Sequence, residues 1–241
     1  MSAFLSNSWL ALVLAAVVAY LMGSINWAII ITKIVSNKDI RDSGSGNAGA
    51  TNVLRTQGPA FAVMTLVLDS AKGIVAVLIG GWLLSAVQLN PGAVESLNPD
   101  NLMKIGQYFA SLFCVLGHLY PVFHGFRGGK GVASTMGILG ILDWRIGLIC
   151  LAIFLITIAC SRMVSLGSVL AMAYVPALTF VLRHWVDKDI PLEMAIFCTI
   201  MAGLVALLVI IKHGTNMRRI INGTENRLNI PTKEKSIKTK E

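Results

Sequence analysis

The chain has 241 residues, of which 55% are hydrophobic and only 13% charged, and its formal net charge is +8. A soluble domain of this length carries roughly a quarter charged residues, so this composition cannot cover a globular surface and excludes a soluble fold. It predicts an all-α integral membrane protein that crosses the bilayer several times. The positive charge is explained by a collar that faces anionic lipid, so no nucleic-acid partner is expected.

Seven apolar segments are predicted to be transmembrane helices, because a helix needs about 20 apolar residues to cross a bilayer. The predicted spans are residues 8–34, 59–84, 105–124, 131–143, 145–161, 163–183 and 191–212. The fourth and fifth are short and separated only by Asp143, Trp144 and Arg145. They favour a hairpin of two short helices, and one re-entrant element is the alternative. We expect residues 1–212 to form one membrane domain and residues 213–241 a tail.

Seven spans put the two termini on opposite sides, and positive charge decides which side is cytoplasmic. One side holds 15 Lys and Arg, eight of them from Lys212 to Lys240, and the other side holds four. This bias predicts a cytoplasmic C-terminus and an N-terminus outside. Four tryptophans fall at the outer helix ends, as an interfacial aromatic belt would. They are Trp9, Trp82, Trp144 and Trp185.

A polar, glycine-rich stretch from Arg41 to Arg55 separates the first two apolar segments. Its glycines let backbone N–H groups turn toward a ligand, and Arg55 adds a planar guanidinium. This chemistry suits a phosphate, and a flexible connecting loop is the alternative. The candidate binding side chains are Ser45, Asn47, Asn52 and Arg55.

Lys130 is surrounded by glycines at the start of the fourth span. A helix N-terminus with exposed N–H groups beside a lysine is an anion site. The stretch is not a Walker A loop, because Gly131 stands where Ser or Thr is required. A lysine that only marks the membrane boundary is the alternative. The candidates here are Gly128, Gly129, Lys130 and Gly131.

Further polar residues lie within or beside the spans. Ser165 and Ser168 are three residues apart and face the same way on a helix, although close helix packing explains small residues equally well. Asp69 and Lys72 lie inside the second span, where ionisable groups are costly unless paired. We expect them to form an ion pair that supports the site loops, and direct ligand contact is the alternative.

The tail begins with His213 and Asn216, which share a helical face where the seventh span ends. No stretch of the sequence offers a carboxylate pair or a His/Cys set with the spacing of metal ligands. We therefore expect activity without a divalent ion and without a cofactor.

Three motifs in this chain resemble those of the bacterial acyl-phosphate:glycerol-3-phosphate acyltransferases. They read Ser-Gly-Asn-x-Gly-Ala-Thr-Asn-x-x-Arg at Ser45–Arg55, Gly-His-x-x-Pro-Val-Phe-x-x-Phe-x-Gly-Gly-Lys-Gly at Gly117–Gly131, and Lys-His-x-x-Asn-x-x-Arg with Gly-Thr-Glu at Lys212–Glu225. The resemblance covers nearly the whole chain. Departures are mild, since Tyr120 stands where the family often has Phe and Arg127 where it often has Lys.

The resemblance implies a seven-helix enzyme of the bacterial inner membrane whose three motifs face the cytoplasm. It would transfer a fatty acyl group from acyl phosphate to the 1-hydroxyl of glycerol 3-phosphate, in phospholipid biosynthesis. Membrane lipid and the enzyme that supplies acyl phosphate would be its other partners. Supporting roles would fall to Asp69, Lys72, His118, Arg218 and Glu225.

Two mechanisms remain open on the sequence alone. His213 could be a general base oriented by Asn216, or a substrate phosphate could take the proton while His213 only binds. The resemblance favours the second, because no carboxylate in the motifs is an evident partner for His213. Ser45 as an acyl-enzyme nucleophile is a third option, but no base adjoins it in sequence. A carrier for an organic phosphate is the alternative function, although the polar groups gather at one face and not at the midplane.

Overall fold

The computed structural model describes residues 2–86, 99–187 and 190–228. All regular secondary structure in these residues is helical, as predicted. Among them, six helical segments are long and apolar enough to cross a membrane. They are Ser8–Ser36, Pro59–Ala86, Pro99–His124, Trp144–Ser161, Val164–Val186 and Leu192–Lys212. The remaining predicted span is a shorter apolar helix, Val132–Leu142.

The first predicted span is confirmed as the apolar segment Ser8–Ser36, but the expectation of one continuous helix is corrected. The chain forms α1 (Ser2–Ser24) and then α2 (Trp27–Ser36). The side chain of Asn26 accepts a hydrogen bond from the backbone N of Ile29 at 3.1 Å and so caps α2. An N-cap of this kind starts a new helix, which hydropathy across residues 8–34 does not reveal.

The remaining elements follow the predicted order. They are η1 (Ile40–Asp42), α3 (Ala50–Gln57), α4 (Pro59–Ala86), α5 (Pro99–Leu119), η3 (Val122–His124), α6 (Val132–Leu142), α7 (Trp144–Ser161), α8 (Val164–Val181), η4 (Leu182–Val186), α9 (Leu192–Lys212) and α10 (Gly214–Ile221). Only Asp143 separates α6 from α7, and it caps α7 by accepting from the backbone N of Arg145 at 3.0 Å. The predicted hairpin of two helices is therefore confirmed.

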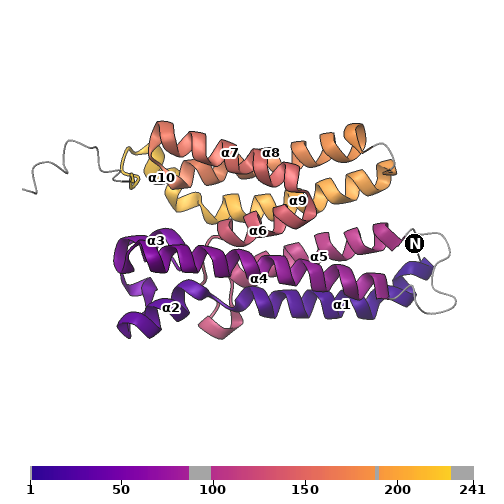
Figure 1. Cartoon of the computed structure of the whole chain (residues 1–241), viewed down its shortest axis with the longest axis horizontal. Helices are drawn as coiled ribbons and strands as arrows, with labels where there is room; N and C mark the ends of the chain where they lie inside the picture. Colours follow the sequence, from indigo (N-terminus) through magenta and orange to yellow (C-terminus); the bar gives the residue numbers. More distant parts are fainter. Residues whose placement is uncertain (1, 87–98, 188–189, 229–241) are drawn as a thin grey trace, which may run out of the picture.

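The helices form two groups with α6 between them. Figure 1 shows α1, α4 and α5 on one side and α7, α8 and α9 on the other. α6 packs against both α4 and α7. The buried core runs through both groups and includes Tyr108, Val115, Leu139, Met172 and Val209.

Glycines allow the backbones of α4, α5 and α6 to approach closely, as small residues do between membrane helices. A Cβ at Gly80 would lie 2.3 Å from the Cβ of Ala110 on α5. A Cβ at Gly137 of α6 would lie 2.4 Å from the carbonyl oxygen of Ser70 on α4. Ser70 also donates a hydrogen bond to the carbonyl of Ala133 at 3.0 Å. α6 is therefore held firmly on α4, which fixes the loop that leads into α6.

The loops singled out by the sequence gather at one end of the bundle. α2, α3 and α10 lie at the end opposite to the start of α1 (Figure 1). The loop between α5 and α6 joins them, because Arg41 of η1 bonds to its carbonyl groups. One end of the molecule thus collects most of the polar loop residues.

We expect Gly80→Ala to destabilise the protein, since overpacking a tight helix contact costs about 1–3 kcal/mol. Gly203→Ala in α9 is the matched control, because a Cβ there meets nothing nearer than 3.7 Å. Thermal unfolding in detergent should show a lower Tm for Gly80→Ala and an equal or higher Tm for Gly203→Ala. Equal Tm values for the two variants would show that the α4–α5 contact is loose.

Candidate active site

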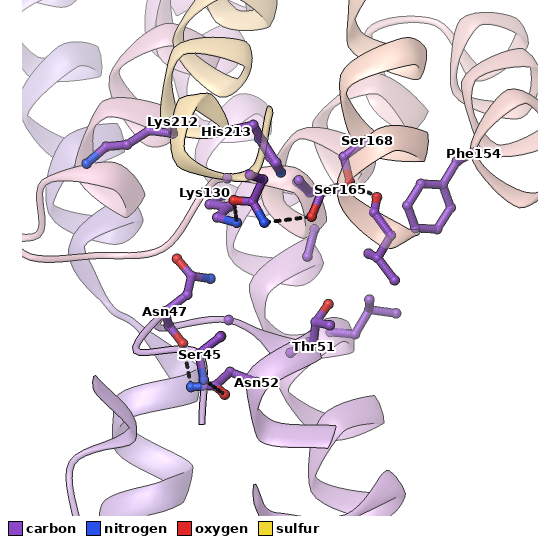
Figure 2. A pocket seen from close by; sticks show the side chains of 18 of the residues that line it. Ser45, Asn47, Thr51, Asn52, Lys130, Phe154, Ser165, Ser168, Lys212 and His213 are labelled. Carbon is purple, nitrogen blue, oxygen red and sulfur yellow. Dashed lines mark hydrogen bonds between the residues drawn. The ribbon is translucent and has the colours of Figure 1, made fainter. Parts of the chain in front are cut away.

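A cavity of about 750 Å³ opens among the loops at this end and extends between the helices. All three sequence segments line it, although they are far apart in the chain. Figure 2 shows Ser45, Asn47 and Asn52 on one wall, facing Lys130, His213 and Ser165. Of the residues predicted for the site, those that line it are Ser45, Asn47, Asn52, Arg55, Asp69, His118, Lys130, Gly131, Ser165, Ser168, His213, Asn216 and Glu225.

Asn52 holds the first loop together. Its side-chain oxygen accepts from the backbone N of Ser45 at 2.9 Å. Its side-chain nitrogen donates to the carbonyls of Ile40, Ser43 and Asn47 at 2.9–3.1 Å. Asn52 is only 1% exposed. These bonds occupy its amide, so the expected phosphate contact is corrected to a loop-shaping role.

The other polar side chains of the first loop remain available. Ser45 and Arg55 are exposed, and Asn47 is half-buried at the cavity wall. Within the described residues, the hydroxyl of Ser45 has no hydrogen bond to a histidine or carboxylate that would activate it as a nucleophile. The loop therefore presents Ser45 and Asn47 as neutral hydrogen-bonding groups, and α3, which follows it, presents the guanidinium of Arg55.

Arg41 joins the first loop to the second, a role that the sequence did not reveal. Its guanidinium donates to the carbonyls of His124 at 2.7 Å and Arg127 at 3.0 Å. Asp39 pairs with the same guanidinium at 2.6 Å. The Asp39-x-Arg41 spacing beside the glycine-rich stretch is the signal that could have identified this clamp.

Gly128 and Gly129 do not offer their N–H groups to a ligand, and this expectation is corrected. Gly128 donates to the carbonyl of Leu119 at 3.3 Å and Gly129 to that of His118 at 3.2 Å. A Cβ at Gly128 would lie 2.0 Å from the carbonyl oxygen of His118. These glycines therefore let the loop pack onto the end of α5. Gly131, with φ of +83°, lines the cavity as the N-cap of α6.

Lys130 extends into the cavity from the α6 N-terminus. It donates a hydrogen bond to the side-chain oxygen of Asn216. Burial, together with the nearby cations Arg219 and Arg55, lowers the pKa of Lys130 to about 8, although Glu225 acts in the opposite direction. Lys130 is thus a partly desolvated ammonium, which binds an anion more strongly than a solvated one does.

Glu225 organises the third segment. Its carboxylate accepts from Ser165 at 2.6 Å and from Asn216 at 2.7 Å, and it pairs with Arg219 at 2.8 Å. Asn216 also donates to Ser165 at 2.8 Å. Burial alone would raise the pKa of Glu225, but these hydrogen bonds outweigh burial and leave the pKa below its ordinary value.

Asn216 does not orient His213, so that part of the general-base hypothesis is corrected. The His213 Nδ1 lies 2.8 Å from the carbonyl oxygen of Val209, which fixes the proton on Nδ1 and the lone pair on Nε2. His213 is 2% exposed. Burial lowers its pKa to about 4. The ring is therefore neutral at pH 7, with Nε2 as its free acceptor.

The remaining candidates differ in their positions. The expected ion pair between Lys72 and Asp69 is confirmed at 2.8 Å. Ser168 donates to the carbonyl of Val164 within its own helix at 2.9 Å. Arg218 is exposed and does not line the cavity. The supporting role expected of Arg218 belongs to its neighbour Arg219, which pairs with Glu225 and lines the cavity.

Lys212 is a further cavity residue that sequence reasoning missed. Its Nζ lies 3.9 Å from the centre of the Tyr120 ring, a cation–π contact. With Arg55, Lys130 and Arg219, it gives the cavity four cations. The carboxylates that line it are Glu225 and Asp69, and Asp69 is neutralised by Lys72. The polar end therefore favours anions.

The other end of the cavity is apolar. Its wall is made by α4, α6, α7 and α8. The residues are Leu66, Met136, Leu151, Phe154, Leu155 and Met172. The arrangement suits a ligand with an anionic head and a hydrocarbon chain. Among the described residues, no three His, Cys, Asp or Glu side chains cluster as metal ligands would. Activity without a metal or cofactor stays a prediction.

Comparison with known proteins identifies relatives along nearly the whole chain. The family profile described as glycerol-3-phosphate acyltransferase matches residues 13–223. A protein of that name from Cereibacter sphaeroides is 41% identical over 225 residues, which cover 93% of each chain. Another from a Thermoanaerobacter species is 40% identical over 223 residues, covering 92% of this chain and 98% of the relative.

Solved structures of similar fold carry a related description. The crystal structure of PlsY, described as an integral membrane glycerol 3-phosphate acyltransferase in its glycerol 3-phosphate form, matches with a TM-score of 0.71 and 32% identity. The match covers 90% of this chain and 96% of that chain. The lysophosphatidic acid form matches with a TM-score of 0.67, also at 32% identity, covering 90% of this chain and 95% of that one.

The charges around Lys130 predict how its pKa responds to mutation. Glu225→Gln should lower the pKa of Lys130 below about 8, because it removes the one carboxylate that raises it. Arg219→Gln should raise it, because a neighbouring cation is lost. Lysine acetylation followed by mass spectrometry across pH 6–11 would measure these values. A wild-type Lys130 that titrates near the ordinary value of about 10.4 would contradict the buried position.

Proposed function

The chain belongs to the glycerol-3-phosphate acyltransferase family, and we propose that it transfers a fatty acyl group from acyl phosphate to the 1-hydroxyl of glycerol 3-phosphate. The 1-hydroxyl oxygen bonds to the acyl carbon, and the bond from that carbon to the phosphate oxygen breaks. The hydroxyl proton leaves with a phosphate oxygen. The products are 1-acylglycerol 3-phosphate, which is lysophosphatidic acid, and inorganic phosphate. This reaction would serve phospholipid biosynthesis.

The observation that carries this proposal is the two-ended cavity. Both substrates bear phosphate, and four cations line the polar end. The four cations come from three separate segments of the chain, so two anionic groups could bind at once. Arg55 lies on α3, and Lys130 lies across the cavity at the start of α6. The apolar end between α4, α6, α7 and α8 accommodates the donor's acyl chain. A solvated phosphate carrier would not need that apolar wall.

Positioning and charge stabilisation are sufficient for this chemistry. An acyl phosphate is already an activated anhydride, so no covalent enzyme intermediate is required. Lys130 and Arg55 would neutralise the phosphates, which otherwise repel each other. The free N–H groups at the start of α6, near Gly131 and Val132, would add a positive dipole end. Holding the hydroxyl and the acyl carbon together supplies the rest of the rate enhancement.

His213 fits a binding role better than a base. Its Nε2 lone pair would accept a hydrogen bond from a hydroxyl of glycerol 3-phosphate. A pKa of about 4 makes it a weak base at pH 7, whereas a phosphate dianion has a pKa near 6. The substrate phosphate is therefore the stronger proton acceptor. It enters the cavity as part of the bound substrate.

We extend the proposal to the membrane arrangement. α6 would be the seventh, short membrane element, the N-terminus would lie outside, and the C-terminus and active site would face the cytoplasm of the bacterial inner membrane. The excess of positive residues near the site end supports this orientation. The exposed Trp9, Trp82, Trp144 and Trp185 fit an outer interfacial belt. Residues 1–212 would be the membrane domain and 213–241 the tail, of which residues 229–241 lie outside the described residues.

Membrane lipid and the enzyme that supplies acyl phosphate would be the physical partners. Acyl phosphate is an amphiphile with a reactive anhydride, so it would reach the cavity through the membrane. The apolar wall opens among lipid-facing helices, where Leu66, Leu151 and Leu155 are exposed on the bundle surface. Delivery from the bilayer would protect the anhydride from water.

A purified protein in detergent should convert acyl phosphate and glycerol 3-phosphate into 1-acylglycerol 3-phosphate and phosphate. Arg55→Ala and Lys130→Ala should each lower kcat/KM by roughly 30-fold to 1,000-fold, on the order of 2–4 kcal/mol. Arg55→Lys should recover only part of the loss, because the planar fork is absent. Product would be measured by mass spectrometry.

Arg127→Ala is the matched control for these variants. Arg127 lies in the same loop as Lys130 and is exposed, but it does not line the cavity. Its replacement should leave kcat/KM near the wild-type value. Near-normal kcat/KM in Arg55→Ala or Lys130→Ala would remove that residue from phosphate binding, and absence of product from the wild type would refute the reaction.

His213→Gln should raise KM for glycerol 3-phosphate by roughly 10-fold or more while kcat changes little, because one buried hydrogen bond is lost. Steady-state kinetics with glycerol 3-phosphate varied would test this at pH 7. A general base would instead show a kcat loss of roughly 100-fold at unchanged KM. Since the pKa of His213 is about 4, the kinetic split at pH 7 is more informative than a pH profile.

A further inference from the structure

His118 lies near the end of α5, where the loop before α3 and the loop between α5 and α6 meet the membrane helices. It is 3% exposed, yet it lines the cavity. The roles assigned above to Arg55, Lys130 and His213 leave it without a function in the reaction. Its surroundings determine which of its two ring nitrogens carries the proton.

Lys72 fixes the tautomer of His118. The Lys72 ammonium donates to the carbonyls of Gly23 at 3.1 Å and Ile25 at 2.6 Å, and its third partner is the His118 Nδ1 at 2.8 Å. Asp69 lies 2.8 Å from the same Nζ and balances its charge. An ammonium group has no acceptor, so the close contact with Lys72 requires Nδ1 to accept the hydrogen bond. The ring is neutral, and its proton is on Nε2.

The Nε2–H group has no hydrogen-bond partner within the part of the chain that the structure describes. A Cβ at Gly129 would lie 2.4 Å from Nε2 and 2.4 Å from the carbonyl oxygen of Ala48. Gly129 thus leaves Nε2 uncovered between the first and second loops. His118 lines the cavity, and Nε2 is not among the fully buried side-chain atoms that lack a partner. The Nε2–H donor is therefore accessible and available to a ligand atom.

We propose that the Nε2–H of His118 donates a hydrogen bond to the carbonyl oxygen of the acyl phosphate and stabilises the negative charge that develops there. This inference rests on the acyl transfer proposed above. His118 transfers no proton in this step. As the 1-hydroxyl oxygen bonds to the acyl carbon, the carbonyl oxygen gains negative charge, and it returns to a carbonyl when the phosphate leaves.

The position of His118 matches that of the acyl carbonyl. In the donor, this group joins the phosphate to the hydrocarbon chain, so it lies at the boundary of the polar and apolar ends of the cavity. His118 Nδ1 is 3.8 Å from Asp69, and Leu66 of the apolar wall is one turn before Asp69 on α4. Lys130 and Gly131 of the polar end follow directly after Gly129.

The neutral state of His118 also suits a carbonyl better than a phosphate. The cavity already holds four cations for phosphate groups. A fixed neutral donor in a buried wall binds a ground-state carbonyl weakly and the transition-state oxyanion strongly, which is the condition for catalysis. Lys72 holds the ring in place through Nδ1, so no reorganisation is needed during the reaction.

Two substitutions separate catalysis from support. The amide nitrogen of His118→Gln reaches the place of Nε2 but loses the bond to Lys72. The amide of His118→Asn reaches only the place of Nδ1, so it keeps a partner for Lys72 and loses the donor to the cavity. If the proposal holds, Gln retains kcat within roughly 10-fold of wild type and Asn loses roughly 100-fold or more.

Further readouts exclude a structural explanation. KM for glycerol 3-phosphate should stay within roughly threefold in both variants, because the proposal gives His118 a contact with the acyl phosphate and none with glycerol 3-phosphate. A structural role through Lys72 predicts the reverse order, with Asn more active than Gln. If His118 only holds Ala48 and the first loop in place, both variants should show a raised KM for glycerol 3-phosphate at unchanged kcat. Either result would overturn the proposal, and Tm values would identify a variant that is simply unfolded.

Wild-type protein gives a test that needs no variant. With ¹⁵N-labelled histidine, NMR should show His118 as the neutral Nε2–H tautomer. Its Nε2 proton should move downfield when a non-reactive acyl phosphonate is added and stay unchanged with glycerol 3-phosphate alone. Absence of that shift would overturn the proposal. If the wild type forms no product, the acyl-transfer function fails; if it is active and His118→Asn keeps its kcat, only this inference fails.

Discussion

The buried ammonium of Lys72 is the interaction on which the site end of the molecule depends. It binds the carbonyls of Gly23 and Ile25 where α1 ends, pairs with Asp69 on its own helix, and holds His118 on α5. An unpaired charge or carbonyl at this depth would cost several kcal/mol. The break between α1 and α2 is tolerated because Lys72 satisfies the carbonyls of Gly23 and Ile25, and that break directs the chain through α2 into the first loop.

The loops are shaped by polar contacts among themselves, which leaves other side chains free for a ligand. The side chains of Asn52 and Arg41 donate hydrogen bonds to loop carbonyls. The backbone N–H groups of Gly128 and Gly129 donate to carbonyls at the end of α5. Because this framework is satisfied internally, Arg55 and Lys130 can present charge to the cavity. In the third segment, the shaping residue is Glu225, whose carboxylate bonds to Ser165, Asn216 and Arg219. The residues that shape the loops and the cations that line the cavity are therefore different residues in the same motifs.

A membrane-embedded acyltransferase must bring a lipid-soluble donor to a water-soluble acceptor. In the proposed reaction the cavity would meet this requirement, because its cationic end adjoins an apolar wall formed by α4, α6, α7 and α8. The short α6 makes the junction possible, because its N-terminus begins inside the cavity and not at the edge of the bundle. Glycine contacts with α4 keep that N-terminus in place.

The sequence alone determined the membrane class, the helix order, the Asp69–Lys72 pair and the three segments that line the site, because hydropathy, charge cost and local motif chemistry are properties of short stretches. The break after Ser24 was hidden, since the mean hydropathy of this segment is high despite Ser24 and Asn26, and the capping role of Asn26 appears only in three dimensions. Only the tertiary structure decided which motif residues face the cavity. The amide of Asn52 and the N–H groups of Gly128 and Gly129 bond to backbone carbonyls. Lys212 and His118, which lie in the same three motifs, contact Tyr120 and Lys72, side chains distant in sequence. Hydrogen-bond partners are set by packing, and packing between distant segments cannot be read from local composition.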